Sequence, residues 1–193
     1  SNKNQVKKII KPEVDTTFSY RDSNYFEAQN INVSIPKDAL YNNLDFQFHI
    51  ADTLSEAITP TYFIHNDYTP LHKAIEVSLK VGRLSEYLRS KATIVHFDRR
   101  KKYYAKGGTW RNNSITAKSN VFGGFAVMID TIPPKISPTN IYENKDMSGN
   151  STITIKISDN LSGIKSFRGT IDGKWIIMEY EAKKAKIFHT FNE

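Results

Sequence analysis

Histidines and carboxylates are the residues of this sequence that could hold a metal ion or move protons. The five histidines stand at positions 49, 65, 72, 96 and 189. Zinc hydrolases usually carry two histidines at His-x-x-x-His or His-x-His spacing, and neither spacing occurs here. His49 with Asp52, or His65 with Asp67, would reach a common site only by converging from separate strands. We therefore expect no resident metal, no cofactor and no catalytic residue.

Other catalytic motifs are also missing from the sequence. It contains no Gly-x-Ser-x-Gly motif and no Gly-rich loop followed by Lys-Ser or Lys-Thr. The absence of cysteine excludes disulfides, thiolate metal sites and a cysteine nucleophile. The 20 Asp and Glu residues form many accidental pairs, so they indicate no glycosidase chemistry. We predict that the chain is not an enzyme; a catalytic domain of unrecognised type, built from scattered His and Asp, is the alternative.

Three aromatic residues are the candidate contacts for a glycan. Tyr103, Tyr104 and Trp110 flank Gly107-Gly108 on an expected hairpin. Exposed rings at the edge of a β-sandwich can stack on sugar rings, whereas the same residues inside a sandwich pack in the core. The sequence leaves both interpretations open.

The segment Ser158–Gly163 offers oxygen ligands at short spacing. Calcium prefers several hard oxygens, which the side chains of Asp159, Asn160 and Ser162 could supply. The same residue types form turns without an ion. A turn and a calcium loop over Asp159–Gly163 are both compatible with the sequence.

The formal net charge of +7 and the pI of about 9.4 favour contact with anionic polymers. The positive residues are spread along the chain, and their densest run is Arg99–Lys102, which we interpret as a solvated turn. We expect no nucleic-acid partner. No stretch approaches the roughly 18 consecutive apolar residues of a membrane helix, so we also expect no membrane span.

Hydrophobic residues alternate with polar ones along most of the chain. This period of two is typical of strands with one buried face, and turns at short intervals favour a sandwich or barrel. Asp172-Gly173 predicts a type I′ hairpin turn, and Pro36 predicts the end of a strand. The expected fold is all-β, with two immunoglobulin-like β-sandwich modules in tandem. The clearest alternating runs are Ile31–Ile35, Phe46–Ile50, Ile75–Val81 and Ile153–Ile157.

The expected boundary between the modules is Asp130–Pro134, because two adjacent prolines stop a sheet from continuing. The first module spans residues 1–129, with roughly the first 20 residues as a linker or edge strand. The second spans residues 130–193 and is small for an independent core. We expect it to have four strands and to be incomplete at its C-terminus, completed by further chain or by strand exchange with another copy. The four expected strands are Thr152–Ser158, Ser166–Ile171, Lys174–Tyr180 and Lys186–Phe191.

Five passages in this order resemble the C-terminal, non-peptidase region of bacterial lysostaphin/LytM-type zinc metallopeptidase-family proteins. The resemblance covers roughly residues 25–191. In that family a separate domain cleaves peptide bonds of peptidoglycan, with zinc held by His-x-x-x-Asp and His-x-His motifs that this chain lacks, so no residue here inherits their role. The passages are Val33–Tyr41, Pro70–Lys73, Phe122–Phe125 leading into Asp130–Pro134, Ser158–Ile164 and Ile171–Trp175.

The resemblance implies an exported protein, periplasmic or extracellular, that faces the bacterial cell envelope. Our leading hypothesis is a non-catalytic accessory segment that spaces or docks a peptidoglycan-directed metallopeptidase domain lying outside this chain. Its expected partners are that peptidase domain or the glycan of the cell wall. The alternative is a glycan-binding β-sandwich module that uses Tyr103, Tyr104 and Trp110.

Overall fold

The computed structural model describes residues 15–98, 100 and 102–191, and it divides into two compact units. Unit 1 spans residues 1–129 and unit 2 residues 130–193. The described part of the chain is mostly β, with several antiparallel sheets and one short α-helix. In the described part of the chain, no helix has the length and apolarity needed to cross a membrane.

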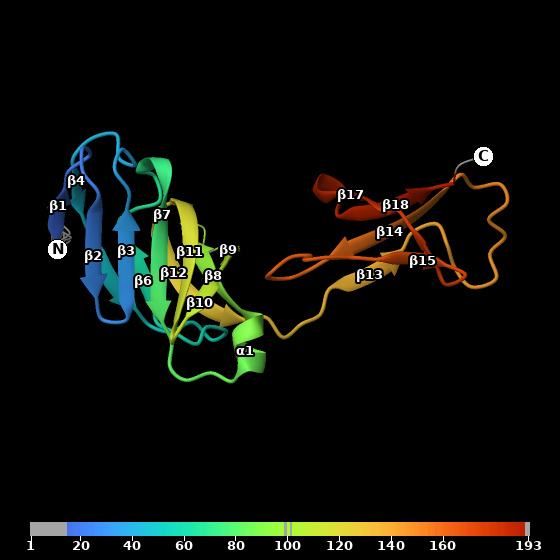
Figure 1. The fold of residues 1–193 in the computed structure, drawn as a ribbon, viewed down its shortest axis with the longest axis horizontal. Helices are drawn as coiled ribbons and strands as arrows, with labels where there is room; N and C mark the ends of the chain where they lie inside the picture. The colour runs from blue at the N-terminus through green and yellow to red at the C-terminus, as the bar shows by residue number, and fades with distance from the viewer. Residues whose placement is uncertain (1–14, 99, 101, 192–193) are drawn as a thin grey trace, which may run out of the picture. The chain divides into compact units, whose positions relative to one another are not determined.

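Unit 1 contains two five-stranded antiparallel sheets (Figure 1). Sheet I has the strand order β10-β11-β7-β3-β2 and sheet II the order β5-β6-β12-β8-β9. A two-stranded pair, β1 (Thr16–Phe18) with β4 (Leu44–Phe46), and the helix α1 (Glu86–Lys91) complete the described unit. The strands of sheet I are β2 (Asn24–Ala28), β3 (Ile31–Ile35), β7 (Pro70–Lys80), β10 (Thr109–Arg111) and β11 (Ser114–Val121). Those of sheet II are β5 (Phe48–Ala51), β6 (Thr61–Ile64), β8 (Ala92–Phe97), β9 (Tyr103–Gly107) and β12 (Gly123–Ile129).

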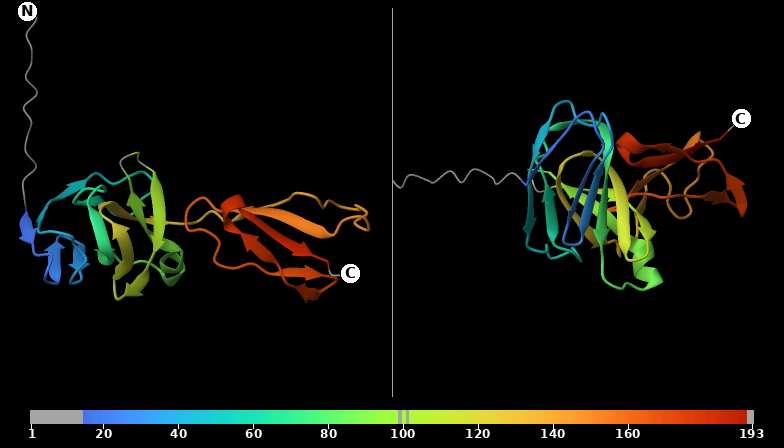
Figure 2. Two further views of the ribbon diagram at one scale, coloured as in Figure 1. Left: turned by 90° about the horizontal axis from the view of Figure 1, so that it is seen from above. Right: turned by 60° about the vertical axis from the view of Figure 1, so that its left-hand side comes forward.

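The two sheets of unit 1 enclose one hydrophobic core. Alternate residues of sheet I, such as Val33 and Val77, and of sheet II, such as Ile64 and Phe125, are fully buried in the same cluster. In the view of Figure 1, β6 and β12 pass behind β3 and β7, and Figure 2 turns the same ribbon by 90° and 60°. Because one face of each sheet fills the core, the intervening residues must face outward. The predicted alternation in Ile31–Ile35 and Ile75–Val81 is thus confirmed.

Unit 2 is built on a four-stranded sheet III with the order β13-β14-β18-β17. Its strands are β13 (Lys135–Pro138), β14 (Thr152–Ser158), β17 (Glu179–Glu181) and β18 (Lys186–Thr190), with a 3₁₀ turn η1 (Ala182–Lys184) before β18. A separate pair joins β15 (Gly169–Ile171) to β16 (Lys174–Ile176). Two of the predicted strands are confirmed, Thr152–Ser158 as β14 and Lys186–Phe191 as β18, which ends one residue earlier. The prediction was wrong for the rest of the unit, because Lys135–Pro138 also pairs and Lys174–Tyr180 is split between β16 and β17.

Two turn predictions are confirmed. Asp172 and Gly173 have φ of 50° and 74° between the paired strands β15 and β16, as a type I′ turn requires. The strand β3 ends at Ile35, directly before Pro36. The prediction of a hairpin around Gly107-Gly108 was wrong, because β9 pairs with β8 in sheet II, whereas β10 pairs with β11 in sheet I.

Candidate functional site: the outer face of sheet I

Gly107-Gly108 carries the chain from one sheet of unit 1 to the other. Gly107 has a φ of 72°, in the left-handed region that glycine adopts without strain. A Cβ on Gly108 would lie 2.4 Å from Cγ1 of Ile115, so only glycine lets the backbone pass this close to the core. Because of this crossing, the Gly-Gly pair that predicted a hairpin turn instead connects β9 and β10, which do not pair with each other.

The crossing separates the three aromatic residues predicted to contact glycan. Tyr103 and Tyr104 lie on β9 of sheet II, and as neighbours in a strand they point to opposite faces. Trp110 lies on β10 of sheet I and packs against the core. Its Nε1–H donates to the Arg89 carbonyl over 2.9 Å, and the Arg89 guanidinium lies 5.1 Å from the ring centroid. The three rings therefore do not form one platform.

The five histidines are scattered, and most have a structural partner. His49 stacks on Phe63 at 4.6 Å, and His72 meets the ring of Tyr41 edge-on at 5.6 Å. Nδ1–H of His189 donates to the Ile177 carbonyl over 2.8 Å. Within the described ranges, no group of three or more His, Cys, Asp or Glu side chains is placed to hold a metal ion.

The fold lowers the pKa of His65 and of His96. His96 is buried, and its Nε2–H donates to the carbonyl of Phe122 over 2.9 Å. Burial lowers the pKa of His96, chiefly because the charged imidazolium loses its hydration. Burial also lowers the pKa of His65, whose Nε2 lies 2.9 Å from the Thr69 hydroxyl. Burial therefore favours the neutral form of both rings.

The Asp159–Gly163 segment has the hydrogen bonds of a turn. Oδ2 of Asp159 accepts from the backbone amides of Leu161 and Gly163, at 2.9 Å and 2.8 Å. Oδ2 of Asp130 accepts from the amide of Ser162 over 3.0 Å and also from its hydroxyl. The Asp159 carboxylate thus serves the backbone as in an Asx turn, and Asp130 holds Ser162 from outside the turn.

The basic run Arg99–Lys102 lies only partly within the described residues, because Arg99 and Lys101 fall outside them. The amides of Arg100 and Lys102 both donate to Oδ1 of Asp98, at 2.8 Å and 3.0 Å. The backbone amide of Asp98 donates to the Lys102 carbonyl over 3.0 Å. Its described part is therefore a turn closed by Asp98.

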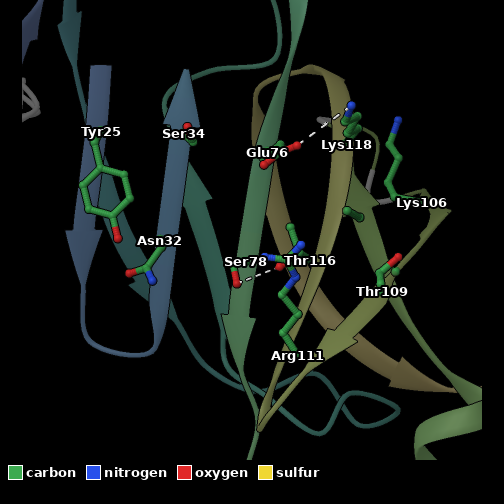
Figure 3. A pocket seen from close by; sticks show the side chains of 12 residues that line it. Tyr25, Asn32, Ser34, Glu76, Ser78, Lys106, Thr109, Arg111, Thr116 and Lys118 are labelled. Atoms are coloured by element: carbon green, nitrogen blue, oxygen red, sulfur yellow. Dashed lines mark hydrogen bonds and ion pairs between the residues drawn. The ribbon is translucent and has the colours of Figure 1, made fainter. Parts of the chain in front are cut away.

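A broad hollow of about 620 Å³ lies on the outer face of sheet I (Figure 3). The strand register sets short polar side chains side by side across it, because Asn32 pairs with Ser78, Ser78 with Thr116, and Thr116 with Thr109. The Thr116 hydroxyl donates to the Ser78 hydroxyl over 2.9 Å. We call Asn32, Ser78, Thr116 and Thr109 the hydroxyl row; four strands contribute to it.

A second row crosses the same face and adds an aromatic ring and charges. The register aligns Tyr25 with Ser34, Ser34 with Glu76, and Glu76 with Lys118. Lys118 and Glu76 form an exposed ion pair of 3.9 Å. Tyr25 is 58% exposed at the β2 edge of the hollow. Partial desolvation and the Glu27 carboxylate raise the pKa of its hydroxyl, so the phenol stays a neutral donor.

Two further cations frame the hollow. Arg111 extends from β10, and Lys106 reaches in from β9 of sheet II (Figure 3). Burial lowers the pKa of Lys106, because its ammonium is partly removed from water. Among the described residues that line the hollow, these two and Lys118 are cations and Glu76 is the one carboxylate. The site can therefore donate and accept many hydrogen bonds, and it favours negatively charged groups.

Sequence reasoning missed this site. Its side chains lie at the outward positions of alternating strands, a signal that marks any solvated sheet face. Ser34, Ser78 and Thr116 are far apart in sequence, and only the register brings them together. Tyr25 was not identified because it stands apart from the Tyr103–Trp110 aromatic run.

Comparison with known protein families matches residues 15–130 to the Zu5-like domain. No curated protein matches the chain. The match runs over the described part of unit 1 and takes in both sheets and the hollow, and it covers more than half of the sequence. The expected relation to lysostaphin/LytM-type peptidases is not part of this finding. On this match, the chain belongs to the Zu5-like domain family.

Proposed function

We propose that the chain is a non-catalytic accessory segment of an exported cell-envelope protein, in which the Zu5-like unit binds glycan through the outer face of sheet I. In this proposal, binding spaces or docks a peptidoglycan-directed zinc metallopeptidase domain that lies outside the chain. The observation that supports it most directly is the hydroxyl row with its flanking cations and the Tyr25 ring. The resemblance to the non-peptidase region of those peptidases supplies the cell-envelope context.

The hollow suits a sugar chain for three chemical reasons. The hydroxyls and amide of the hydroxyl row can exchange hydrogen bonds with sugar hydroxyls, each group acting as donor or acceptor. The exposed ring of Tyr25 can stack on the apolar face of a pyranose. Lys106, Arg111 and Lys118 can pair with carboxylate or phosphate substituents. The hollow is also open and runs across strands, which suits a polymer better than an enclosed small molecule.

A binding role is favoured over catalysis because, among the described residues, no hydrogen bond joins a serine or threonine hydroxyl of the hollow to a histidine or carboxylate. Thr116 donates to Ser78, another hydroxyl, and Glu76 faces Lys118. An activated nucleophile needs a histidine or other base within hydrogen-bond reach. The buried His96 instead donates to a backbone carbonyl.

The finer fold proposal is that both units are immunoglobulin-like sandwiches in tandem. Antiparallel pairing throughout the named sheets supports it. The neighbours β11-β7-β3 are not consecutive in sequence, so the chain must pass to the other sheet and back between them, which also supports it. A superposition of experimental coordinates of each unit on immunoglobulin-type strand orders tests this. A strand order in either unit that fits no such sandwich would contradict it.

The binding proposal is tested by sedimentation of the full chain with purified peptidoglycan and with an anionic polysaccharide such as polygalacturonate. Tyr25→Ala should weaken binding about three- to tenfold through lost stacking. The double variant Arg111→Ala/Lys118→Ala should weaken it further, and added salt should reduce wild-type binding because exposed charges are screened. Both changes lie at exposed positions, where destabilisation should stay within about 0.5 kcal/mol.

Tyr87→Ala/Lys91→Ala is the matched control. Tyr87 is 65% exposed and lies with Lys91 on α1, outside the residues that line the hollow, so the double variant removes one ring and one cation elsewhere on unit 1. It should bind as the wild type does. Equal sedimentation of all variants, or no sedimentation of the wild type with either polymer, would contradict glycan binding through sheet I.

A further inference from the structure

The outer face of sheet II carries a groove whose chemistry is opposite to that of the hollow on sheet I. It has a volume of about 340 Å³. Its floor and walls are largely apolar, with Phe63, Phe97 and Met128 from three strands of the sheet and Leu54 and Tyr103 beside them. Small-molecule and peptide side-chain sites typically combine such a lining with a few polar groups.

The segment between β5 and β6 forms one wall of this groove. Its second half runs along β12, where the Ile58 amide donates to the Val127 carbonyl over 2.9 Å and Ala57 makes a β-bridge with Met128. The Val127 amide in turn donates to the Thr59 hydroxyl over 3.0 Å. These bonds fix the end of the segment to the sheet, so that its first half, with Leu54 and Glu56, borders the groove.

Carboxylates border the groove on sheet II, whereas cations frame the hollow on sheet I. Asp52 and Glu56 lie on the segment between β5 and β6, and Asp98 directly follows β8. Asp98 is held in place by the amides of Arg100 and Lys102. An apolar groove bordered by carboxylates favours a ligand that carries a cation beside apolar groups.

An unpartnered hydroxyl gives a second, independent sign of a ligand. Thr61 is 3% exposed, and its Oγ1 has no hydrogen-bond partner in the structure. Tyr62 and Ile64 point into the core, so by strand alternation Thr61 and Phe63 point to the outer face, and both line the groove. A buried hydroxyl without a partner is destabilising, and a donor or acceptor supplied by a ligand would remove this penalty.

We propose that this groove binds a peptide segment in which a lysine-type ammonium stands beside aliphatic side chains. The ammonium would lie between the carboxylates of Asp52, Glu56 and Asp98, and the aliphatic groups would cover Phe63 and Leu54. A backbone or ammonium group of the peptide would satisfy the Thr61 hydroxyl. The site is separate from the hollow on sheet I and does not depend on glycan binding there.

Calorimetric titration of the full chain with a synthetic peptide tests the proposal. The probe is an acetylated, amidated hexapeptide in which leucine alternates with lysine, and two control peptides carry glutamate for lysine or serine for leucine. The probe should bind saturably at one site per chain, and both control peptides should bind much more weakly. Since the chain carries a net charge of +7, general charge attraction would favour the glutamate peptide instead.

Two variants locate the site. Asp52→Asn/Glu56→Gln alters exposed residues and should weaken binding of the probe about threefold or more. Thr61→Val keeps the side-chain shape and should weaken binding about two- to tenfold through the lost hydrogen bond, while the melting temperature stays the same or rises. Glu27→Gln, which removes a carboxylate from sheet I, should leave the affinity unchanged. Absence of saturable binding, equal binding of the glutamate peptide, or wild-type affinity in both groove variants would overturn the proposal.

Discussion

The two units of this chain show the same alternation of polar and apolar residues, but they bury their apolar side chains to very different extents. In unit 1, large side chains such as Phe46, Phe122 and Phe125 are fully buried between two five-stranded sheets. In the described part of unit 2, the buried apolar side chains are Ile153, Ile157 and Ile187, from sheet III alone.

Large apolar side chains of unit 2 remain in contact with water. Ile136, Tyr142, Trp175 and Ile177 are each at least 60% exposed. Alternation along a strand sets which face a side chain occupies, but burial requires a second layer against that face. Unit 1 has this second layer over the whole of its core. We therefore expect the stability of unit 1 to depend on core packing, and that of unit 2 to depend more on turns and backbone pairing.

The largest expected effect is on the core of unit 1. Phe46 is fully buried, and its ring centroid lies 4.8 Å from that of Phe18 and 4.9 Å from that of Phe26. Phe46→Ala should lower the free energy of unfolding of unit 1 by about 3–5 kcal/mol, because it leaves a cavity among these rings. Chemical denaturation followed by residue-resolved NMR should show an earlier transition for unit 1 and an unchanged one for unit 2. Equal shifts in both transitions would show that the units unfold together.

The two tryptophans offer a matched comparison, one in each unit. Trp110 packs against the core of unit 1 and donates to the Arg89 carbonyl, whereas Trp175 on β16 is 61% exposed. Trp110→Ala should destabilise unit 1 by about 3 kcal/mol, at the low end for a partly buried ring. Trp175→Ala should change the stability of unit 2 by no more than about 0.5 kcal/mol. Thermal unfolding by calorimetry measures both, and a large loss for Trp175→Ala would mean that unit 2 buries this ring.

Acid should lower the stability of unit 1 through its buried His96. The folded-state pKa of His96 lies below its ordinary value of 6.5, so the unfolded chain binds the proton more readily. The stability associated with neutral His96 is therefore fully present above about pH 6.5 and is lost as the pH falls towards the lowered pKa. The melting temperature of unit 1 should decrease between about pH 7 and pH 5, and His96→Gln should make this dependence shallower. A profile that is equally steep in the variant would assign the effect to other groups.

The smallest effect concerns the β15–β16 turn of unit 2. Gly173 has a φ of 74° with open space around its Cα, so alanine would be strained without a clash. Gly173→Ala should cost about 1 kcal/mol. Gly149 also has open space but lies outside the left-handed region, and Gly149→Ala should be neutral or slightly stabilising. Unfolding of the two variants side by side measures the difference, and equal stabilities would show that the turn contributes little to unit 2.

Local features of the fold were predictable from the sequence because each depends on neighbouring residues. Backbone geometry and the pleat of a strand are enough to predict three of them. These are the alternation over Ile31–Ile35 and Ile75–Val81, the strand end before Pro36 and the turn at Asp172-Gly173. The separation of the three aromatic rings was not predictable in this way. Tyr103 and Trp110 are close in sequence, but the chain changes sheets between them at Gly107-Gly108.

The sequence by itself determined which side chains of each strand are polar and point away from a core, because the pleat of a strand imposes a period of two. Only the tertiary structure decided which of these side chains become neighbours. Asn32, Ser78 and Thr116 share one row because the β3–β7–β11 register aligns them, and that register is set by the packing of Val33, Val77 and Ile115 in the core. A shift of one residue in any of these strands would turn its hydroxyls inward, so the hollow on sheet I follows from the core beneath it.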